Sequence, residues 1–282
     1  MFHRICWHKQ TRTTLGGKFT RIDAGIQNMI KKYYRPQSLP DAFLLLNKPN
    51  TIPLAGGTYI TTEINSEFNV VDLQDLGLDK VVVQNQKIEI GSTTKLQQLH
   101  QNQHIPEFFR TAIKLEAPLN IRNSASLGGL LVTCDGRSPV ATSLLALDAR
   151  IILDPDREEI LISNFFSFRS SITRKRLITS IILPSLQNFS FAYVARTPFD
   201  RPIVSTAMSM WMNGRSRLAL GGYGAQPLLV IDGQILDDIS LAARSAFSNA
   251  EDEWASAYYR SEMAGVLATR CLKIIKNKFG KQ

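Results

Sequence analysis

Two paired-glycine segments constrain the fold of this chain more than any other feature of its sequence. The first glycine segment is PLAGGTYI at residues 53–60, and the second glycine segment is IRNSASLGGLL at residues 121–131. Each places two adjacent glycines between an apolar entry and an apolar exit. Glycine tolerates positive φ and lets backbone N–H groups approach an anion closely, and successive N–H groups form a nest for a phosphate. Two such nests, far apart in the sequence, would suit a dinucleotide held from both sides.

The glycine pairs do not identify a ligand by themselves, because such a pair between strands is more often a plain tight turn. Neither segment matches the GxGxxG pattern of Rossmann folds or the GxxxxGK[ST] pattern of phosphate-binding loops. The sequence therefore gives no support to the two nucleotide-binding folds that glycine-rich loops usually indicate.

The hydrophobic pattern predicts an α+β fold. Helices are expected at 39–47, 96–101, 107–116, 138–149 and 255–277, and Thr93 or Thr94 is a candidate to cap the second of them. Strands are expected at 52–55, 70–73 and 177–184, with hairpins at 80–91 and 149–163. Further on, three β-type stretches at 191–196, 203–212 and 217–224 predict a three-stranded antiparallel sheet.

These elements divide the chain into three parts. Residues 1–28 lack helical or strand periodicity and are interpreted as a flexible N-terminal extension or an incorrectly assigned start. Residues 29–186 form the predicted mixed domain. Residues 187–282 form the predicted smaller domain, a sheet followed by a terminal helix.

Composition argues against several classes of protein. Cys6, Cys134 and Cys271 are far apart and form no CxxC pair, so this chain alone is not expected to hold zinc or an iron–sulfur cluster. The same unpaired cysteines suit a reducing cytoplasm. No apolar run reaches the roughly 18 residues of a membrane-spanning helix, and residues 1–28 lack the apolar core of a secretory signal. The net charge of +9 comes from scattered basic residues, which does not favour nucleic-acid binding.

Few other side chains suggest chemistry. His100 and His104 lie four residues apart on an expected helix and are a possible metal pair, but no third ligand is evident and a solvated helix face is favoured. Asp148 is expected to organise the turn after its helix. The sequence contains no arguable Ser-His-Asp or Cys-His set, so no catalytic residue and no metal site is predicted.

Seven segments occur together in one order between Ile30 and residue 275. They are YYRPQSLPDAFLLL, LAGGTYI, IRNSASLGGLL, LLALDARIIL, LITSIILP, FAYVARTPFDRPIVSTAMSM and RLALGGYGAQPLLV. Taken together, they resemble the FAD-binding medium subunit of the xanthine dehydrogenase and carbon monoxide dehydrogenase family of molybdenum hydroxylases. The resemblance implies a two-lobed FAD-binding domain of the vanillyl-alcohol-oxidase (PCMH) type, followed by a small α+β domain, with the flavin between the lobes.

The resemblance also implies which residues hold FAD. The first glycine segment would hold the pyrophosphate through backbone amides and a threonine hydroxyl, and it matches Leu54, Ala55, Gly56, Gly57, Thr58 and Tyr59. The second would contact the same diphosphate, and it matches Ser126, Leu127, Gly128 and Gly129. Leu177 or Ile178 would supply a backbone contact to the edge of the flavin ring. Tyr193, where a basic residue is common in the family, would flank the isoalloxazine or serve as a core tyrosine.

The sequence departs from the family pattern at several positions. Leu130 follows the second glycine pair where the family usually has Asn, and an acidic residue that often follows falls on Pro139. Asp135 or Arg137 would replace that acidic residue only if the loop were reshaped. Tyr59 stands where a polar or acidic residue is common. These changes remove side-chain contacts but leave the backbone nests, so FAD binding is still expected, with a weaker second half.

In the resembling family, substrate is oxidised at a molybdopterin cofactor on a large subunit, and electrons pass through [2Fe–2S] clusters of a small subunit to FAD. The resemblance thus implies an electron-transfer oxidoreductase subunit, inactive on substrate alone, in a dimer of heterotrimers. The substrate and the external acceptor, NAD or another, stay open. Two alternatives remain: a scaffold subunit that has lost or weakened FAD binding, and a self-contained flavoenzyme, against which the small C-terminal domain argues.

Overall fold

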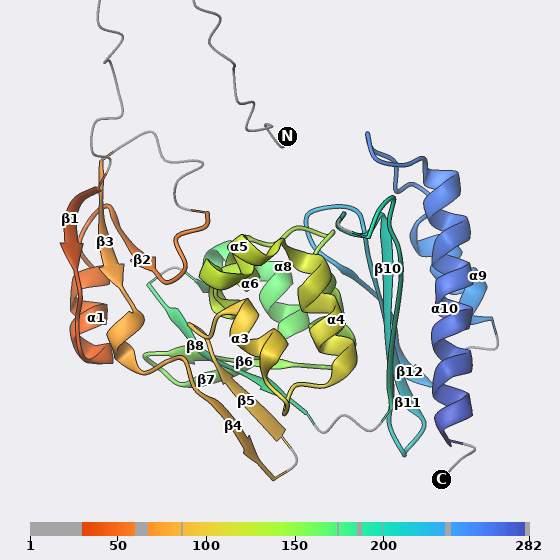
Figure 1. The fold of residues 1–282 in the computed structure, drawn as a ribbon, viewed down its shortest axis with the longest axis horizontal. Coiled ribbons are helices and arrows are strands. Elements are labelled where there is room, and N and C mark those ends of the chain that lie inside the picture. The colour runs from red at the N-terminus through yellow and green to blue at the C-terminus, as the bar shows by residue number, and fades with distance from the viewer. Residues whose placement is uncertain are drawn as a thin grey trace, which may run out of the picture.

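The computed structural model describes residues 30–59, 67–85, 87–173, 175–184, 188–198, 200–234 and 238–279. The predicted extension at 1–28 therefore lies outside the described residues. The described chain forms an N-terminal lobe, a central lobe and a C-terminal unit, which follow one another across the molecule (Figure 1). None of the helices in these ranges is long and apolar enough to cross a membrane.

The N-terminal lobe is a small parallel sheet with one helix packed on it. Its strands lie in the order β1-β3-β2, with both pairings parallel, and they are β1 (Ile30–Tyr34), β2 (Thr51–Leu54) and β3 (Phe68–Asp72). Helix α1 (Leu39–Leu46) begins after Ser38, whose side chain accepts a hydrogen bond from the Asp41 N–H. A 3-10 turn, η1 (Gln74–Leu76), follows β3. Helix α1, β2 and β3 confirm predicted elements, whereas β1 was not predicted because its residues are mostly exposed and lack alternation.

The central lobe is built on an antiparallel sheet. The strands lie in the order β4-β5-β8-β6-β7, and they are β4 (Val81–Gln84), β5 (Lys87–Gly91), β6 (Arg150–Asp154), β7 (Glu158–Leu161) and β8 (Leu177–Leu183). The two predicted hairpins are confirmed as β4–β5 and β6–β7. The predicted strand at 177–184 is the middle strand β8, which is buried along nearly its whole length because it has a neighbour on each side.

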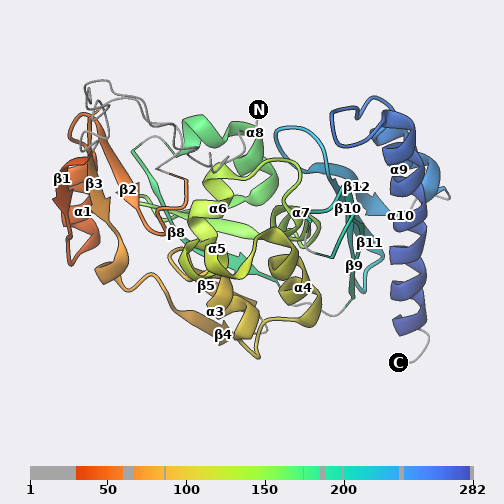
Figure 2. The same cartoon turned by 45° about the horizontal axis from the view of Figure 1, so that its top comes forward.

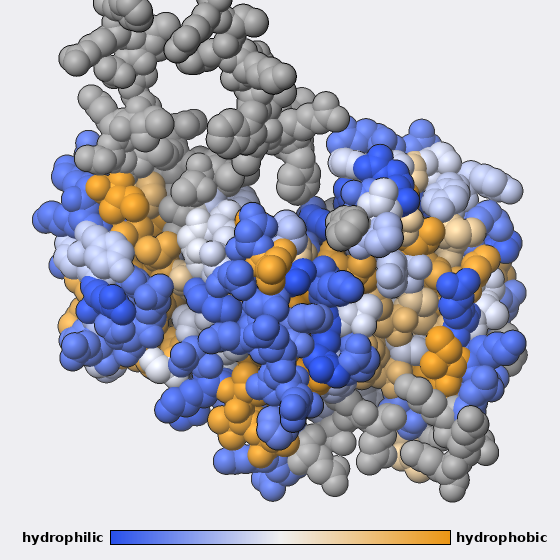
Figure 3. Space-filling model, viewed as in Figure 1, coloured by the Kyte–Doolittle hydropathy of each residue, from blue (hydrophilic) through white to orange (hydrophobic). Residues whose placement is uncertain are grey.

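Six helices of the described chain cover this sheet (Figure 2). They are α3 (Leu96–Gln101), α4 (Glu107–Glu116), α5 (Leu119–Ser124), α6 (Leu127–Thr133), α7 (Pro139–Ala146) and α8 (Ile162–Ile172). The surface of this lobe is mainly hydrophilic in the view of Figure 3, and the apolar sides of the helices form the central core. Helix α7 ends before the predicted limit because Asp148 has φ of +56°. Helix α8 was not predicted, and Phe168 within it is not helical.

The C-terminal unit has four strands, so the predicted three-stranded sheet is wrong by one strand. The order is β12-β11-β10-β9, all antiparallel, and the strands are β9 (Phe189–Val194), β10 (Val204–Met210), β11 (Arg215–Gly221) and β12 (Leu228–Gln234). Strand β12 was missed because it is an edge strand in which only Ile231 is buried, so it shows little alternation. Helix α9 (Ile239–Ala246) was also missed, whereas the predicted terminal helix is confirmed as α10 (Ala257–Phe279).

The C-terminal sheet lies between the central lobe and helices α9 and α10 (Figures 1 and 2). Alternate residues of β9 face opposite sides of this sheet. Ser190 faces α10, and its hydroxyl donates to the Cys271 carbonyl at 3.0 Å. Phe189 faces α4, and its ring stacks on Phe108 with 3.9 Å between centroids. The sheet therefore closes the central core on one side and a second core under α10 on the other.

Two buried ion clusters fasten the C-terminal unit to the central lobe. Arg201, between β9 and β10, contacts Asp135 at 2.7 Å and Glu116 at 3.4 Å. On β11, Arg217 is 1% exposed and pairs with Asp148, the second residue after α7. Asp148 lies in the turn after α7 with a left-handed φ, and the printed contacts of its carboxylate are with Arg215 and Arg217 of β11, so its predicted role in organising that turn stays a prediction.

Candidate functional site

The first glycine segment follows the carboxyl end of β2, the end at which open sheets with parallel strands usually bind ligands. Leu54 is paired with Asp72 of β3, and Ala55 packs on the core of the N-terminal lobe. Gly57 has φ of +69°, a left-handed conformation that favours glycine. Within the described chain, no hydrogen bond occupies the backbone N–H groups from Ala55 to Thr58. The predicted turn is present here, and its donors have no internal partner.

The second glycine segment is not a turn. Helix α6 begins at Leu127, so Gly128 and Gly129 lie in its first turn, and neither has a positive φ. Ser126 is the N-cap, and its side-chain oxygen accepts a hydrogen bond from the Gly129 N–H at 3.3 Å. The prediction of a glycine turn at this segment is therefore wrong. A capping serine before an apolar run and the packing of that run outweigh the low helix propensity of glycine.

Packing, rather than a positive φ, explains the glycine at position 128. A Cβ on Gly128 would lie 2.8 Å from the Ser92 Cβ and 3.0 Å from the Ser92 carbonyl oxygen. The Gly128 N–H donates to that oxygen at 2.8 Å, and the Leu127 N–H donates to the Thr94 carbonyl at 3.0 Å. Because these two donors are satisfied and the Gly129 N–H is used by the N-cap Ser126, the structure leaves no N–H of the predicted nest at 127–129 without a partner.

The structure brings the two glycine segments into direct contact. A Cβ on Gly56 would lie 2.4 Å from the Ser124 carbonyl oxygen and 3.0 Å from the Ala125 Cα. Both of these atoms belong to the backbone immediately before α6, so a side chain at position 56 would force the segments apart. The glycine at 56 is thus required by a close approach between the N-terminal and central lobes.

A third segment, Ser92–Lys95 between β5 and α3, touches both glycine segments. Lys95 forms an isolated antiparallel bridge with Ser126. Its ammonium donates to the Ala55 carbonyl at 3.2 Å. At the other end of the segment, the Ser92 N–H donates to the Thr179 carbonyl of β8 at 3.0 Å. No motif in the sequence marks this segment as part of the site.

Three hydroxyls of this third segment are left without a hydrogen-bond partner in the described part of the chain. The side-chain oxygens of Ser92, Thr93 and Thr94 are buried and make no hydrogen bond among the described residues. The predicted capping of α3 by Thr93 or Thr94 is therefore wrong. The N-cap is Lys95, whose backbone N–H donates to the Gln98 side-chain oxygen at 3.0 Å.

Leu177 and Ile178 lie at the start of β8, where the two lobes meet. Leu177 is 5% exposed and belongs to the core of the N-terminal lobe, whereas Ile178 is 7% exposed and belongs to the central core. Because both side chains are buried in cores, a ligand at this strand would meet backbone atoms. The backbone contact expected from the resemblance stays a prediction with compatible geometry.

The ring contact of Tyr193 is with its own strand, β9, and not with the glycine segments. It follows Phe189 and Phe191 at alternate positions of β9, on the face toward the central lobe, and its ring is 6.0 Å from that of Phe191. Tyr193 is 38% exposed, so it is not a core tyrosine. Among the described residues, no hydrogen bond or ring stacking joins Tyr193 to either glycine segment.

The positions that depart from the family pattern have structural uses of their own. Leu130 packs on the central core, and Pro139 is the buried first residue of α7. Asp135 pairs with Arg201, and the Arg137 guanidinium stacks 4.4 Å from the Trp254 ring centroid. These contacts hold the C-terminal unit. Exposed Tyr59 shares the turn with Thr58.

Two charged groups lie behind the first glycine segment. Asp72 is 2% exposed and accepts hydrogen bonds from the Tyr33 hydroxyl and from the Gln74 N–H. The hydrogen bond to Asp72 raises the pKa of Tyr33. Burial lowers the pKa of Lys95, and the negative charge of Asp72 opposes that shift.

The described cysteines and histidines form no metal site. Burial raises the pKa of Cys134 to about 12 and that of Cys271 to about 11, so both thiols stay protonated near neutral pH. The His100 ring nitrogen Nδ1 lies 3.1 Å from the Arg110 carbonyl, and His104 follows the end of α3. No group of three or more potential metal ligands occurs in the described part of the chain.

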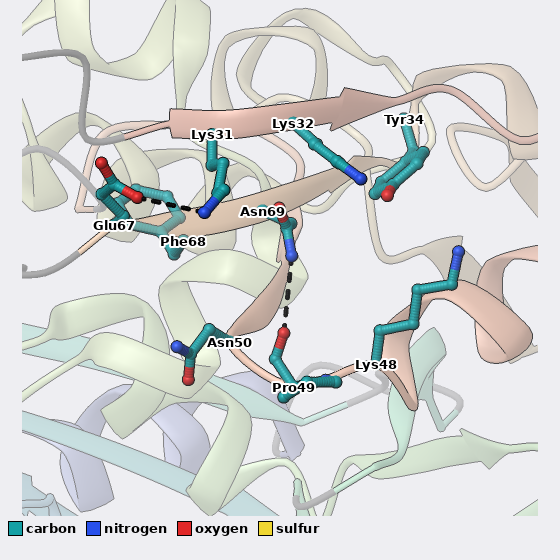
Figure 4. Close-up of a pocket in the computed structure, with 9 residues that line it drawn as sticks. All are labelled: Lys31, Lys32, Tyr34, Lys48, Pro49, Asn50, Glu67, Phe68 and Asn69. Carbon is teal, nitrogen blue, oxygen red and sulfur yellow. Dashed lines mark hydrogen bonds and ion pairs between the residues drawn. The ribbon is translucent and has the colours of Figure 1, made fainter.

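A hollow of about 710 Å³ lies on the N-terminal lobe (Figure 4). Basic side chains of Lys31, Lys32 and Lys48 line it, and Lys31 pairs with Glu67 at 3.4 Å. Its lining comes from β1, from the residues just before β2 and from the amino end of β3, whereas the first glycine segment follows the carboxyl end of β2. No predicted FAD residue lines this hollow, so it is separate from the glycine segments.

The residues at the glycine segments fit the diphosphate of FAD. Consecutive unpartnered N–H groups surround the left-handed Gly57, and the exposed Thr58 adds a hydroxyl beside them. Lys95 places a positive charge at the same turn, and buried hydroxyls without partners lie in the segment that it ends. The second glycine segment contributes fewer free donors than the sequence predicted.

Comparisons with known proteins identify the family. The profile described as the FAD binding domain in molybdopterin dehydrogenase matches residues 26–186. The Escherichia coli protein YgfM, of uncharacterised function, is 27% identical over 248 residues, which cover 85% of this chain and 94% of that protein. The glyceraldehyde dehydrogenase medium chain of Sulfolobus acidocaldarius is 25% identical over 271 residues, which cover 86% of this chain and 96% of that one.

A solved structure shows the same fold. It is CO dehydrogenase from Oligotropha carboxidovorans, which matches with a TM-score of 0.76 at 24% identity over 88% of this chain and 98% of that one. The predicted α+β fold class is thereby confirmed. Because the family profile spans more than half of the sequence, this chain belongs to the family of FAD-binding domains in molybdopterin dehydrogenases and is an oxidoreductase subunit.

Proposed function

We propose that this chain binds FAD with its diphosphate against the first glycine segment. The observation that carries the proposal is the contact between Gly56 and Ser124, which holds a turn with unpartnered N–H groups against the second glycine segment. Phosphate oxygens accept several hydrogen bonds at once, and consecutive backbone donors match that need. Family membership supports FAD as the dinucleotide.

The two segments contribute unequally in this proposal. At the first, the N–H groups of Ala55, Gly56, Gly57 and Thr58 and the Thr58 hydroxyl serve the diphosphate. At the second, the Ser126 hydroxyl proton remains as a donor, since the Leu127, Gly128 and Gly129 N–H groups bond to Thr94, Ser92 and the Ser126 side-chain oxygen. The first glycine segment therefore supplies most of the binding energy.

The flavin ring would lie toward β8 and β9. We assign the backbone of Leu177 or Ile178 to the ring edge, because their side chains are committed to the two cores. Tyr193 is assigned to a position beside the ring. Its exposure and its place on the face of β9 that looks toward the central lobe support that assignment.

The cellular role that follows is electron transfer within a larger assembly. When bound, FAD would take electrons from [2Fe–2S] clusters of a small partner subunit and pass them to an external acceptor. The chain supplies position and electrostatics, and the substrate would react at a molybdopterin subunit. The Sulfolobus relative is the medium chain of a dehydrogenase, which supports an assembly of several chains. The cytoplasmic location expected from the unpaired cysteines stays a prediction.

A scaffold subunit without FAD is the second candidate. It is favoured by Leu130, which replaces the usual Asn, and by the internally satisfied N–H groups of Leu127 and Gly128. The two candidates share the same fold and partners and differ in whether the first glycine segment alone retains the cofactor.

Native mass spectrometry of the complex purified through a tag on this chain tests the proposal. We expect co-purification of a large and a small subunit in equal amounts, with FAD released from this chain on denaturation. A stoichiometric complex without flavin would support the scaffold instead. Turnover of an organic substrate by the isolated chain would contradict the electron-transfer role.

A further inference from the structure

Lys95 occupies an unusual place between the two glycine segments. It is the residue immediately before α3, and its backbone bridges to Ser126 at the start of the second segment. Its side chain reaches in the other direction, so that Nζ donates to the Ala55 carbonyl of the first segment at 3.2 Å. One lysine thus joins both segments, through its backbone to one and through its ammonium to the other.

The geometry of the peptide bond gives this contact a directional consequence. In a planar trans peptide, the carbonyl of one residue and the N–H of the next point in opposite directions. Holding the Ala55 carbonyl toward Lys95 therefore turns the Gly56 N–H toward the opposite side. The Gly56 N–H has no hydrogen-bond partner among the described residues, and no Cβ shields it.

The charge of Lys95 adds to this orientation. A hydrogen bond from an ammonium to a carbonyl polarises the peptide and strengthens its N–H as a donor. Lys95 is partly buried, which reduces solvent screening of its charge. The charged group that acts on it from another element is Asp72 of β3, which also accepts the Tyr33 hydroxyl.

We propose that Lys95 is a positioning residue of the FAD site, whose ammonium fixes the Ala55–Gly56 peptide so that the Gly56 N–H serves the diphosphate. This inference rests on the proposed function, since it concerns the same glycine segment. It assigns to one side chain the pre-organisation that the altered second segment no longer supplies. The sequence pattern of glycine segments gave no indication of it.

FAD affinity of the full chain, stripped of flavin, tests this role in four proteins. They are the wild type, Lys95→Met, Lys95→Arg and Lys87→Met, the last being an exposed lysine of β5 that matches the change in net charge. We expect Lys95→Met to raise the Kd for FAD about tenfold or more, which corresponds to about 1.4 kcal/mol or more. Lys95→Arg and Lys87→Met should stay within about threefold of the wild type, which is less than about half of that free-energy change.

The alkaline pH profile separates a charge effect from a purely structural one. Burial lowers the pKa of Lys95. The affinity of the wild type for FAD should therefore fall at a pH below the pKa of an ordinary lysine, because the ammonium loses its proton there. Arginine stays protonated throughout, so Lys95→Arg should lose this alkaline fall. Lys95→Met should bind weakly at every pH, without the fall. Thermal unfolding of each variant shows whether it folds.

Distinct outcomes separate the two hypotheses. A wild-type chain that binds no FAD would overturn the proposed function itself. If the wild type binds FAD and Lys95→Met binds it equally well, only the role of Lys95 is overturned. The same holds if Lys95→Arg keeps the alkaline fall in affinity. The arginine variant keeps the test decisive even if the methionine variant does not fold.

Discussion

Gly56 lies so close to Ser124 that an added Cβ would stand 2.4 Å from the serine carbonyl oxygen. This contact joins the turn after β2 to the end of α5, and therefore joins the two lobes at the proposed diphosphate site. The backbone carbonyl cannot move aside as a flexible side chain would. The position of the first glycine segment is thus coupled to the start of α6.

Gly56→Ala should separate the two glycine segments. We expect the free energy of unfolding to fall by about 1–3 kcal/mol, as for other overpacked sites, and FAD to dissociate readily. Urea denaturation and the flavin content of the purified variant measure the two effects.

Gly57→Ala is the matched comparison at the neighbouring position. Its added Cβ would make only an ordinary contact of 3.4 Å with Leu54, but φ is +69°. Backbone strain alone should cost about 1–2 kcal/mol. If Gly56→Ala bound FAD as tightly as the wild type, the close contact would have no part in the site.

The two glycines of the second segment should respond in opposite ways. Gly128→Ala would press on the Ser92 backbone and destabilise the protein, whereas the Cβ of Gly129→Ala meets only the Ser126 side-chain oxygen, whose N-cap bond it would weaken. Because alanine favours a helix over glycine by about 1 kcal/mol, about what such a cap contributes, Gly129→Ala should unfold no more easily than the wild type.

Gly129→Ala should nevertheless weaken FAD binding, because its methyl group would stand at the exposed residue beside the Ser126 hydroxyl of the second segment. Isothermal titration with FAD and urea denaturation give the two quantities independently. An unchanged Kd in this variant would show that the second segment makes no direct contact with the diphosphate.

Removing the buried Arg217 should lower the free energy of unfolding far more than removing the exposed Arg150, which also lies on an antiparallel strand. Arg217 is 1% exposed and pairs with Asp148 and Asp232 between the central lobe and the C-terminal sheet. Arg217→Met leaves these carboxylates with one fewer cation and should cost about 3 kcal/mol. Arg150→Met removes an exposed pair with Glu159 and should cost less than about 1 kcal/mol. Equal costs in urea denaturation would contradict this account of the interface.

Glu116 should make stability depend on pH. Burial raises the pKa of this carboxyl, although Arg201, the Ser138 hydroxyl and the Val140 N–H oppose the shift, and Asp135 reinforces it. Between the ordinary pKa and the raised one, the folded state binds more protons than the unfolded state. The free energy of unfolding contributed by Glu116 is therefore full below the ordinary pKa and is lost as pH rises through the raised pKa.

Glu116→Gln removes that titration while it keeps a side chain able to accept the bonds from Ser138 and Val140. We expect a smaller decline in stability with rising pH in this variant, measured by urea denaturation from acid to neutral pH. Glu253→Gln, at an exposed position, is the control. A decline as steep in Glu116→Gln as in the wild type would assign the pH dependence to another group.

The sequence predicts those elements whose periodicity is strong. Helix α7, strand β8 and the terminal helix α10 are long or wholly apolar on one face, and they lie near their predicted limits. Edge strands β1 and β12 were not predicted, because an edge strand buries few side chains and so lacks a clear alternation.

The site was predictable only in part, for a physical reason. Gly57 is required by the positive φ of a local turn, which the sequence can indicate. Gly56 and Gly128 are required by contacts with backbone that is distant in the chain. The glycine pair at 128–129 was interpreted as a turn because its helical geometry depends on tertiary packing. Lys95 carries no local signal either, since its partner Ala55 lies 40 residues away in the chain.

The flavin content of the purified chain decides whether the first glycine segment holds FAD. The chain is denatured, and the released cofactor is identified by mass and quantified by absorbance against the protein concentration. We expect about one FAD per chain, with a marked loss in Gly56→Ala. A folded wild-type chain that releases no flavin, and that takes up none when FAD is added, would contradict it.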